Sequence, residues 1–349
     1  MAAGPSHRAV LAPASPYQEA IWGAALGVAG IDTRNVARPD SVAQFAAAAA
    51  PADADTLLVV DLHRIAAESL DLIAYAQALR ERDPGRPWIA TLGARVSVSE
   101  SERALARAVG AVDLVALVDH RDLPSLRALS GALSQAGVAN NAEALFAALR
   151  SAPPLGLPVP IALVHAAGYT VQALVGRMQG VDGVDRADRR YAGKTYADCF
   201  VGSEALDWLA GALGASRATA LEVGQCLLEH GVFHHVVKDH AFRDEQLFYR
   251  FATISPAVEA IALDDLVKQM WSPGGLPVAP RGYRGKTYDD CFVGSEAVDW
   301  IVRRYALSRE EAVTLGQQLF DLGLAHHVVD EHPFKDGHYF FRFRRHEYA

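Results

Sequence analysis

Few side chains in this sequence combine the residue types and the spacing that chemistry requires. The histidines gather in two groups, each containing an adjacent pair: His234, His235 and His240, then His326, His327, His332 and His338. Adjacent residues of a strand point to opposite faces, so such a pair is a poor chelate. The nearby acids complete no recognisable ligand spacing. We therefore expect no metal site and no cofactor.

The thiols and the motif content also argue against catalysis. The three cysteines, Cys199, Cys226 and Cys291, form no CxxC pair. Buried, reduced thiols in an intracellular protein are the expectation for an odd count without a disulfide framework. The sequence contains no P-loop, no GxGxxG and no Ser-His-Asp ordering. These observations predict a protein that is not an enzyme and has no catalytic residues.

Asp61 is an acidic residue that the sequence places at the end of an expected strand, after the apolar run TLLVV. Runs that are apolar throughout suit strands buried on both faces of a parallel sheet. Expected strands cover 9–11, 56–62, 88–92 and 112–118, and expected helices cover 17–28, 41–50, 70–82, 99–109 and 123–135. The alternation predicts a doubly wound α/β domain over residues 1–150.

In element order and length, residues 8–135 resemble the receiver domain of response regulators, which is flavodoxin-like, and the resemblance places a phospho-acceptor at Asp61. A receiver holds Mg²⁺ with further carboxylates after its first strand and has a lysine after its fifth. Here AVLAPASP offers no acid and VALVDHRD no lysine, although Thr91 or Ser97 could supply a hydroxyl. We expect a pseudo-receiver used for protein contact. The alternative is a switch in which phosphorylated Asp61 controls the rest of the chain.

One stretch of the sequence occurs twice. GKTYADCFVGSEALDW begins at Gly193 and GKTYDDCFVGSEAVDW begins at Gly285. A period of this length is too long for solenoid repeats and indicates two copies of an independent small domain. We place the first copy at 168–254 and the second copy at 258–346. The proline-rich SAPPLGLPVP opens a linker, residues 151–167.

Local patterns predict how each copy is built. Ser203 and Ser295 precede an apolar periodic run and are expected to cap a helix. Trp208 and Trp300 are expected to anchor the core together with Phe200 and Phe292. Gly224 and Gly316 lie inside the next helix, where close approach of another helix would explain them. An aromatic strand closes each copy, giving helix, hairpin-like segment, helix, helix and two-stranded wing.

Both copies resemble DEP domains end to end. The shared text is K-T-Y-x-D-C-F-V-G-S-E-A-x-D-W, then a GQ-x-L helix and H-H-V-V followed by F-x-D and F-x-R-F. The resemblance implies an α+β winged-helix-type fold with a β-hairpin arm. It also implies a non-catalytic role in signal transduction, docking onto partner proteins or membranes. The arms are expected at 180–194 and 272–286.

The two arms differ in charge. The first carries Arg189, Arg190 and Lys194 among several aspartates. The second carries Arg281, Arg284 and Lys286 with no acid between 272 and 286. A basic residue near an anionic surface contributes about 1 kcal/mol to binding. The six residues form the predicted docking surface, and the second arm is the better candidate for anionic phospholipid.

Overall charge bears on the remaining alternatives. The chain has a net charge of −8, and acids outnumber bases on both helices that would enter DNA in a winged helix. Nucleic-acid binding is therefore the least favoured alternative. No signal peptide and no membrane-spanning apolar run is recognised. We expect a cytoplasmic adaptor whose contact with the inner face of a membrane is peripheral.

Overall fold

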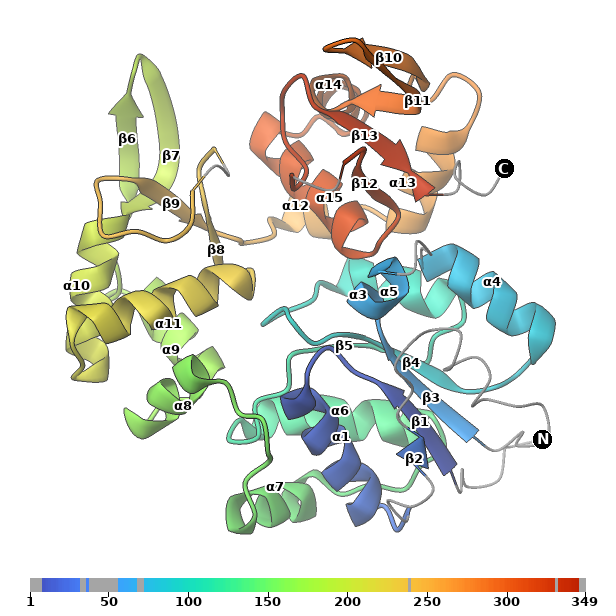
Figure 1. Ribbon diagram of the computed structural model, residues 1–349, viewed down its shortest axis with the longest axis vertical. Helices are drawn as coiled ribbons and strands as arrows, with labels where there is room; N and C mark the ends of the chain where they lie inside the picture. The colour runs from blue at the N-terminus through green and yellow to red at the C-terminus, as the bar shows by residue number, and fades with distance from the viewer. Residues whose placement is uncertain are drawn as a thin grey trace.

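The computed structural model describes residues 8–31, 36–37, 56–67, 72–237, 240–329 and 332–344. Its N-terminal unit is a sheet covered by helices (Figure 1). All its strand pairs are parallel, and the strand order is β2-β1-β3-β4-β5. The strands are β1 (Arg8–Ala12), β2 (Val36–Ala37), β3 (Thr56–Asp61), β4 (Trp88–Leu92) and β5 (Leu114–Ala116).

Side chains of the sheet alternate between two apolar clusters, because successive residues of a strand face opposite ways. Leu58 and Val60 belong to one cluster, and Leu57 and Val59 belong to the other. The helices of the unit are α1 (Pro16–Val28), α3 (Leu62–Ala67), α4 (Leu72–Arg82), α5 (Glu100–Ala108), α6 (Leu123–Gln135) and α7 (Ala142–Ser151). The predicted α/β class is confirmed, and the strand order is that of flavodoxin-like domains. The receiver identity of the unit stays a prediction.

Three elements of this unit were not predicted: β2, α3 and α7. Strand β2 has two residues, too few to show a pattern. Helix α7 begins after Asn141, whose side-chain oxygen accepts a hydrogen bond from the backbone N–H of Ala144 at 2.9 Å. The predicted helix at 41–50 lies outside the described residues.

The predicted linker at 151–167 contains a helix, α8 (Val159–Ala166). Pro160 lies in its first turn, where the missing backbone N–H has no helical partner to lose. Ile161 and Val164 are buried, and α8 packs against a helix of the first copy. The proline-rich segment therefore ends in a structural helix and is not extended throughout.

Each copy has the predicted order of elements. In the first copy these are α9 (Val171–Gln179), β6 (Ala187–Tyr191), β7 (Lys194–Val201), α10 (Gly202–Leu213), α11 (Arg217–Glu229), β8 (Phe233–His235) and β9 (Phe248–Phe251). In the second they are α13 (Leu263–Trp271), β10 (Ala279–Tyr283), β11 (Lys286–Val293), α14 (Gly294–Tyr305), α15 (Arg309–Asp321), β12 (Ala325–His327) and β13 (Phe340–Phe343), after a short α12 (Pro256–Glu259). The sheet orders, β6-β7-β9-β8 and β10-β11-β13-β12, correspond strand for strand.

The predicted capping role of Ser203 and Ser295 is wrong. The N-cap positions are Val201 and Val293, which make no side-chain capping bond. Carbonyl groups of the loop before the last strand accept the first helical N–H groups instead. The N–H of Gly202 donates to Leu247 O at 2.9 Å, and that of Ser203 donates to Glu245 O at 3.1 Å. Serine caps do open the following helices, at Ser216 and Ser308.

The mid-helix glycines and the tryptophans also differ from expectation. A Cβ on Gly224 or Gly316 would lie 2.2 Å from the ring of Phe242 or Phe334, so an aromatic ring rather than a helix requires these glycines. Phe200 and Phe292 are fully buried, as expected. Trp208 is only partly buried, and its Nε1–H donates to Asp182 O at 2.8 Å, which fastens the base of the first arm. Trp300 is likewise partly buried.

The three units touch one another (Figure 1). Helix α13 of the second copy packs on α5 of the N-terminal unit, and α11 of the first copy packs on α8. The two copies meet directly where Arg250 Nη1 lies 2.9 Å from Glu310 Oε1. Among the described helices, no single one is long and apolar enough to cross a membrane. The bent pair of α8 and α9 meets the criterion only when the two are taken together.

Candidate functional site

Each copy projects a two-stranded arm, β6–β7 or β10–β11. The last residue pair before the turn is Tyr191 with Lys194 in the first arm and Tyr283 with Lys286 in the second. Each turn therefore has two residues. Both turn residues have positive φ: 48° and 79° at Ala192 and Gly193, and 47° and 77° at Arg284 and Gly285. This is a type I′ hairpin turn, in which the second residue favours glycine. The turn therefore presents the repeated Gly-Lys at the tip of each arm.

The structure separates the predicted docking residues into two groups. Arg281 Nη2 lies 2.8 Å from Glu296 Oε2 at the base of the second arm. Arg189 Nη2 lies 3.2 Å from Asp185 and 3.1 Å from Glu204. These two arginines are engaged in ion pairs within their own copy, and their contribution to docking stays a prediction. Their positive charge is already balanced.

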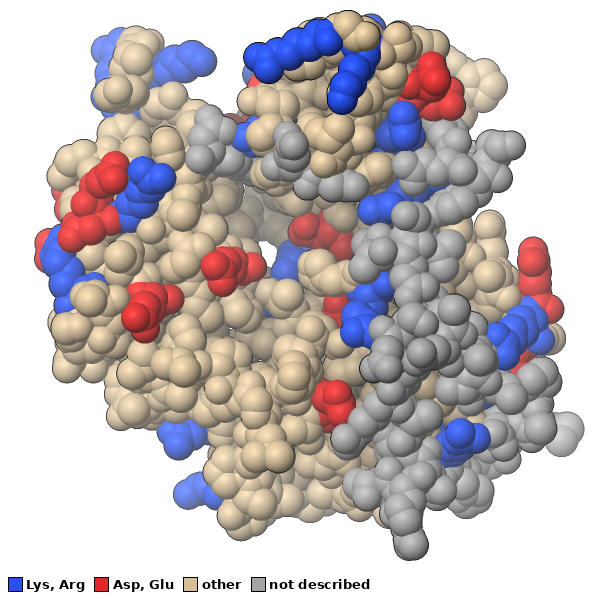
Figure 2. Space-filling view, in the orientation of Figure 1, with Lys and Arg blue, Asp and Glu red and all other residues tan. Residues whose placement is uncertain are grey.

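The other four predicted residues, Arg190, Lys194, Arg284 and Lys286, are exposed. Among the described residues, none forms an ion pair with them. Tyr283 at the second tip is 51% exposed, and the guanidinium of Arg284 lies over its ring, 5.2 Å from the centroid. Both arms lie at the same end of the molecule, and Figure 2 shows basic side chains gathered there. Each tip thus combines an exposed aromatic ring with unbalanced positive charge.

Asp61 has the surroundings of a structural carboxylate. It is fully buried. One oxygen accepts from Thr91 Oγ1 at 2.9 Å and from the Gly93 N–H at 2.8 Å, and the other accepts from the His63 N–H at 3.0 Å. A Cβ on Gly93 would lie 3.3 Å from this carboxylate, so the backbone of Gly93 packs closely against it. The proposed phospho-acceptor role of Asp61 does not fit a carboxylate that is saturated with donors and closed to solvent.

We therefore expect no phosphorylation of Asp61. After incubation with acetyl phosphate and Mg²⁺, intact-mass measurement should find no gain of a phosphoryl group, and Asp61→Asn should behave like the unchanged protein. A stable adduct that Asp61→Asn abolishes would contradict this expectation.

The loop that follows β4 joins the N-terminal unit to both copies. Arg95 Nη1 donates to Glu102 Oε1 at 2.6 Å and to Asp321 Oδ2 of the second copy at 2.9 Å. Gln318 Nε2, also of the second copy, donates to Ser99 Oγ at 2.9 Å. The N–H of Val96 donates to the backbone oxygen at the end of α11 in the first copy, 3.2 Å away. Seven residues of loop thus hold all three units together.

A cavity of about 330 Å³ lies at this junction. Its lining includes His63 and Arg95 from the N-terminal unit, His235 and Glu229 from the first copy, and Asp321 from the second. Figure 2 shows an opening at the centre of the molecule with acidic and basic side chains on its rim. The hydrogen bond from His63 to Asp61 raises the pKa of His63. Burial raises the pKa of Asp321, against the opposing effect of Arg95.

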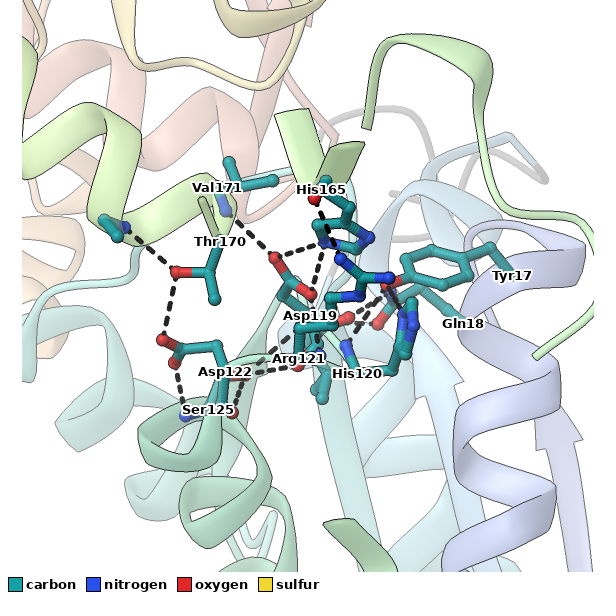
Figure 3. Close-up of polar contacts among 12 residues, drawn as sticks. Tyr17, Gln18, Asp119, His120, Arg121, Asp122, Ser125, His165, Thr170 and Val171 are labelled. Carbon is teal, nitrogen blue, oxygen red and sulfur yellow. Dashed lines mark hydrogen bonds and ion pairs between the residues drawn. The ribbon is translucent and has the colours of Figure 1, made fainter. Parts of the chain in front are cut away.

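A second junction centres on Asp119, beyond the end of β5 (Figure 3). His165 of α8 lies with Nε2 at 2.9 Å from Asp119 Oδ1. The first N–H of α9, from Val171, donates to Asp119 Oδ2 at 2.9 Å. Burial alone would raise the pKa of Asp119, but the bonds from His165 and from two backbone N–H groups outweigh it and lower that pKa. We name this group, with the Arg121 side chain that donates to His165 O, the Asp119 clamp.

Oxygen and nitrogen atoms of Asp119, His120 and His165 lie within 4.8 Å of one another, a grouping that could hold a metal ion. No local pattern in the sequence predicts this grouping, because His165 lies far from the other two residues in the chain. Both oxygens of Asp119 already accept hydrogen bonds from protein donors, and the Arg121 guanidinium lies beside them. The geometry therefore fits hydrogen bonding better than coordination.

The thiols and the winged-helix alternative can be assessed directly. Cys199 and Cys291 are buried, and burial raises the pKa of both. Burial also raises the pKa of Cys226 to about 11, so all three thiols are poor nucleophiles at neutral pH. Helix α15, which would enter DNA, binds the N-terminal unit through Gln318 and Asp321. This occupied face argues against nucleic-acid binding.

Residues 183–251 and 275–343 each match the model of the domain found in Dishevelled, Egl-10, and Pleckstrin, the DEP domain. The chain carries two DEP domains in tandem. The first and second copies are DEP1 and DEP2, and the predicted resemblance is confirmed for both.

Two curated relatives show how the chain compares with longer proteins. It is 35% identical over 170 residues to the mouse Phosphatidylinositol 3,4,5-trisphosphate-dependent Rac exchanger 1 protein, which covers 46% of this chain and 10% of that protein. It is 43% identical over 70 residues to Vacuolar membrane-associated protein IML1 of Saccharomyces cerevisiae, covering 20% of this chain and 4% of that protein. The chain thus spans a tenth or less of the length of these relatives.

Proposed function

We propose that this chain is a non-enzymatic signalling adaptor that docks onto an anionic membrane surface through the arm of DEP2, with the arm of DEP1 as a second contact. The observation that carries the proposal is the tip of β10–β11. There Tyr283, Arg284 and Lys286 are exposed together, and no ion pair with a described residue balances the two charges. A basic tip attracts anionic lipid, and tyrosine favours the interface between water and hydrocarbon.

The shape of the molecule supports the proposal. The arms lie at one end, and the N-terminal unit holds both DEP domains through the loop after β4 and the Asp119 clamp (Figure 1). Two weak contacts on one rigid body bind more tightly than either contact alone, because the second binding event is intramolecular. The names of the two relatives, one dependent on a phosphoinositide and one associated with the vacuolar membrane, support a membrane as the partner.

Sedimentation with phosphatidylserine vesicles tests the proposal. We expect the chain to bind these vesicles and not vesicles of phosphatidylcholine alone. Arg284→Gln with Lys286→Gln should weaken binding roughly thirtyfold at low salt, since each basic residue near the surface contributes about 1 kcal/mol. Arg190→Gln with Lys194→Gln in DEP1 should have a smaller effect, because Asp182, Asp185 and Asp188 of the first arm lower the local positive potential, whereas the second arm has no acid between 272 and 286.

A charge-matched control separates the arm from net charge. Lys268→Gln with Arg303→Gln removes the same charge from helices α13 and α14 of DEP2, away from the tip. Vesicle binding by this control should stay near that of the unchanged protein. Two results would contradict membrane docking: an equal loss of vesicle binding in the two double variants, or no vesicle binding by the unchanged protein. Docking onto protein partners would then remain as the proposed role of the DEP domains.

A further inference from the structure

A cavity of about 520 Å³ lies between the N-terminal unit and the turn that leads into DEP1. It lies beside the Asp119 clamp, on the side of the loop that follows β5. Its walls come from this loop, from α7 and from the α8–α9 turn. The lining residues are His120, Arg121, Phe146, Leu149, Arg150, Pro153, Gly168, Tyr169 and Thr170. A cavity of this volume is in the range of small-molecule sites.

The lining is positively charged. Arg121 and Arg150 line it, and no acid does. Asp119 and Asp122 lie nearby but already accept hydrogen bonds, Asp119 from His165 and Asp122 from the Ser125 N–H at 2.8 Å. Arg121 donates one N–H to His165 O, and its guanidinium has further N–H groups that can donate to a ligand. Arg150 is exposed, lies 5.7 Å from the centroid of the Phe146 ring, and has no acidic partner among the described residues.

His120 is a buried side chain that lines the same cavity. It is only 3% exposed. The Tyr17 hydroxyl accepts the backbone N–H of His120 at 3.2 Å, so its own proton is free for His120 Nδ1 at 3.0 Å (Figure 3). Burial lowers the pKa of His120 to about 4, so the ring is neutral at pH 7 and carries one N–H.

We propose that this cavity binds a soluble small molecule that carries a phosphate group. Arginine forks and a neutral histidine N–H are suited to phosphate oxygens. The apolar walls of Phe146, Leu149 and Tyr169 suit an organic portion of the ligand. A divalent cation is a poorer fit, because two guanidinium groups line the space.

The position of the cavity selects a soluble ligand rather than a lipid headgroup. Helices α7 and α8 lie at the end of the molecule opposite to the arms (Figure 1). When the chain docks through its arms, this cavity lies away from the bilayer. The choice of a soluble ligand therefore rests on the proposed function. A ligand here would contact both the β5–α6 loop and the turn into α9. Its binding would tighten the junction between the N-terminal unit and DEP1.

Calorimetric titration of the full chain tests the proposal, with inorganic phosphate, pyrophosphate and adenosine monophosphate as probes at constant ionic strength in chloride. We expect saturable 1:1 binding of at least one probe. Arg150→Gln should weaken it roughly tenfold, as expected for loss of one charge-assisted contact. The control Arg127→Gln removes another exposed arginine, which pairs with Glu143 outside the cavity, and it should leave affinity unchanged.

The outcomes separate this proposal from membrane docking. The proposal is supported if Arg150→Gln weakens binding of a soluble phosphate and Arg127→Gln does not. This conclusion holds whatever the vesicle experiment shows. Absence of saturable binding by the unchanged chain, or equal affinity in Arg150→Gln, overturns it. Loss of vesicle binding in Arg150→Gln without any binding of soluble phosphates would also overturn it, since the cavity would then serve a lipid headgroup.

Discussion

Replacing Arg95 with methionine should lower the free energy of unfolding by about 3 kcal/mol, because it leaves two carboxylates without their cation in a buried junction. Glu102 is fully buried, and Arg95 donates to it and to Asp321 of DEP2. Methionine has much of the volume of arginine, so the loss of unfolding free energy results mainly from removal of the positive charge. Chemical denaturation measures the change, and hydrogen exchange in α15 should rise first because DEP2 loses its hold on the N-terminal unit.

Arg107 provides a matched control for this prediction. It also pairs with two acids, Glu100 at 2.6 Å and Asp113 at 3.1 Å, but its side chain is 43% exposed. Exposed pairs of this kind contribute about 0–1 kcal/mol because water screens them. Arg107→Met should therefore be nearly neutral. If Arg95→Met were no more destabilising than Arg107→Met, the junction after β4 would not hold DEP2.

Replacing Asp119 with alanine should cost about 3 kcal/mol at neutral pH and loosen DEP1 from the N-terminal unit. The change leaves His165 and the N–H of Val171, both of which are buried, without the carboxylate to which they bond. The folded protein holds the pKa of Asp119 below its usual value of 3.8. The stability from its charged form is therefore present above pH 3.8 and is lost as the pH falls through the lower, folded pKa.

Denaturation of the unchanged and Asp119→Ala chains across pH tests both parts of this prediction. The difference between them should hold steady from pH 7 to about pH 5 and narrow in stronger acid. Asp122→Ala is the control, since Asp122 caps α6 and its loss should cost about 1 kcal/mol. A difference between the unchanged and Asp119→Ala chains that stays constant in strong acid would mean that the Asp119 charge does not stabilise the junction.

The two largest expected effects thus fall on residues that sequence reasoning did not select. Arg95 and Asp321 are 226 positions apart, and Asp119 and Val171 are 52 apart. Neither pair carries a local pattern, because an ion pair between distant segments depends only on where the fold brings them. The one local signal is the run of charged residues in VALVDHRD, which contains Asp119.

Local sequence determined the parts of this protein whose physical cause is local. Apolar runs marked β3 and β5 because strands buried on both faces need no polar side. The repeat marked both DEP domains, and Gly193 and Gly285 suited turns that require positive φ. Ser216 and Ser308 cap helices α11 and α15 through bonds within the first turn, so the physical cause of each cap is local.

Tertiary structure alone decided the rest. Ser203 looked like a cap until the wing loop supplied carbonyls to the same N–H groups. Asp61 looked like an acceptor until packing buried it beneath Thr91 and Gly93. Arg281 and Arg284 are alike in sequence, yet Glu296 balances only the first. Charge, exposure and hydrogen-bond supply at a residue are set by neighbours in space, and those neighbours come from segments that no local pattern connects.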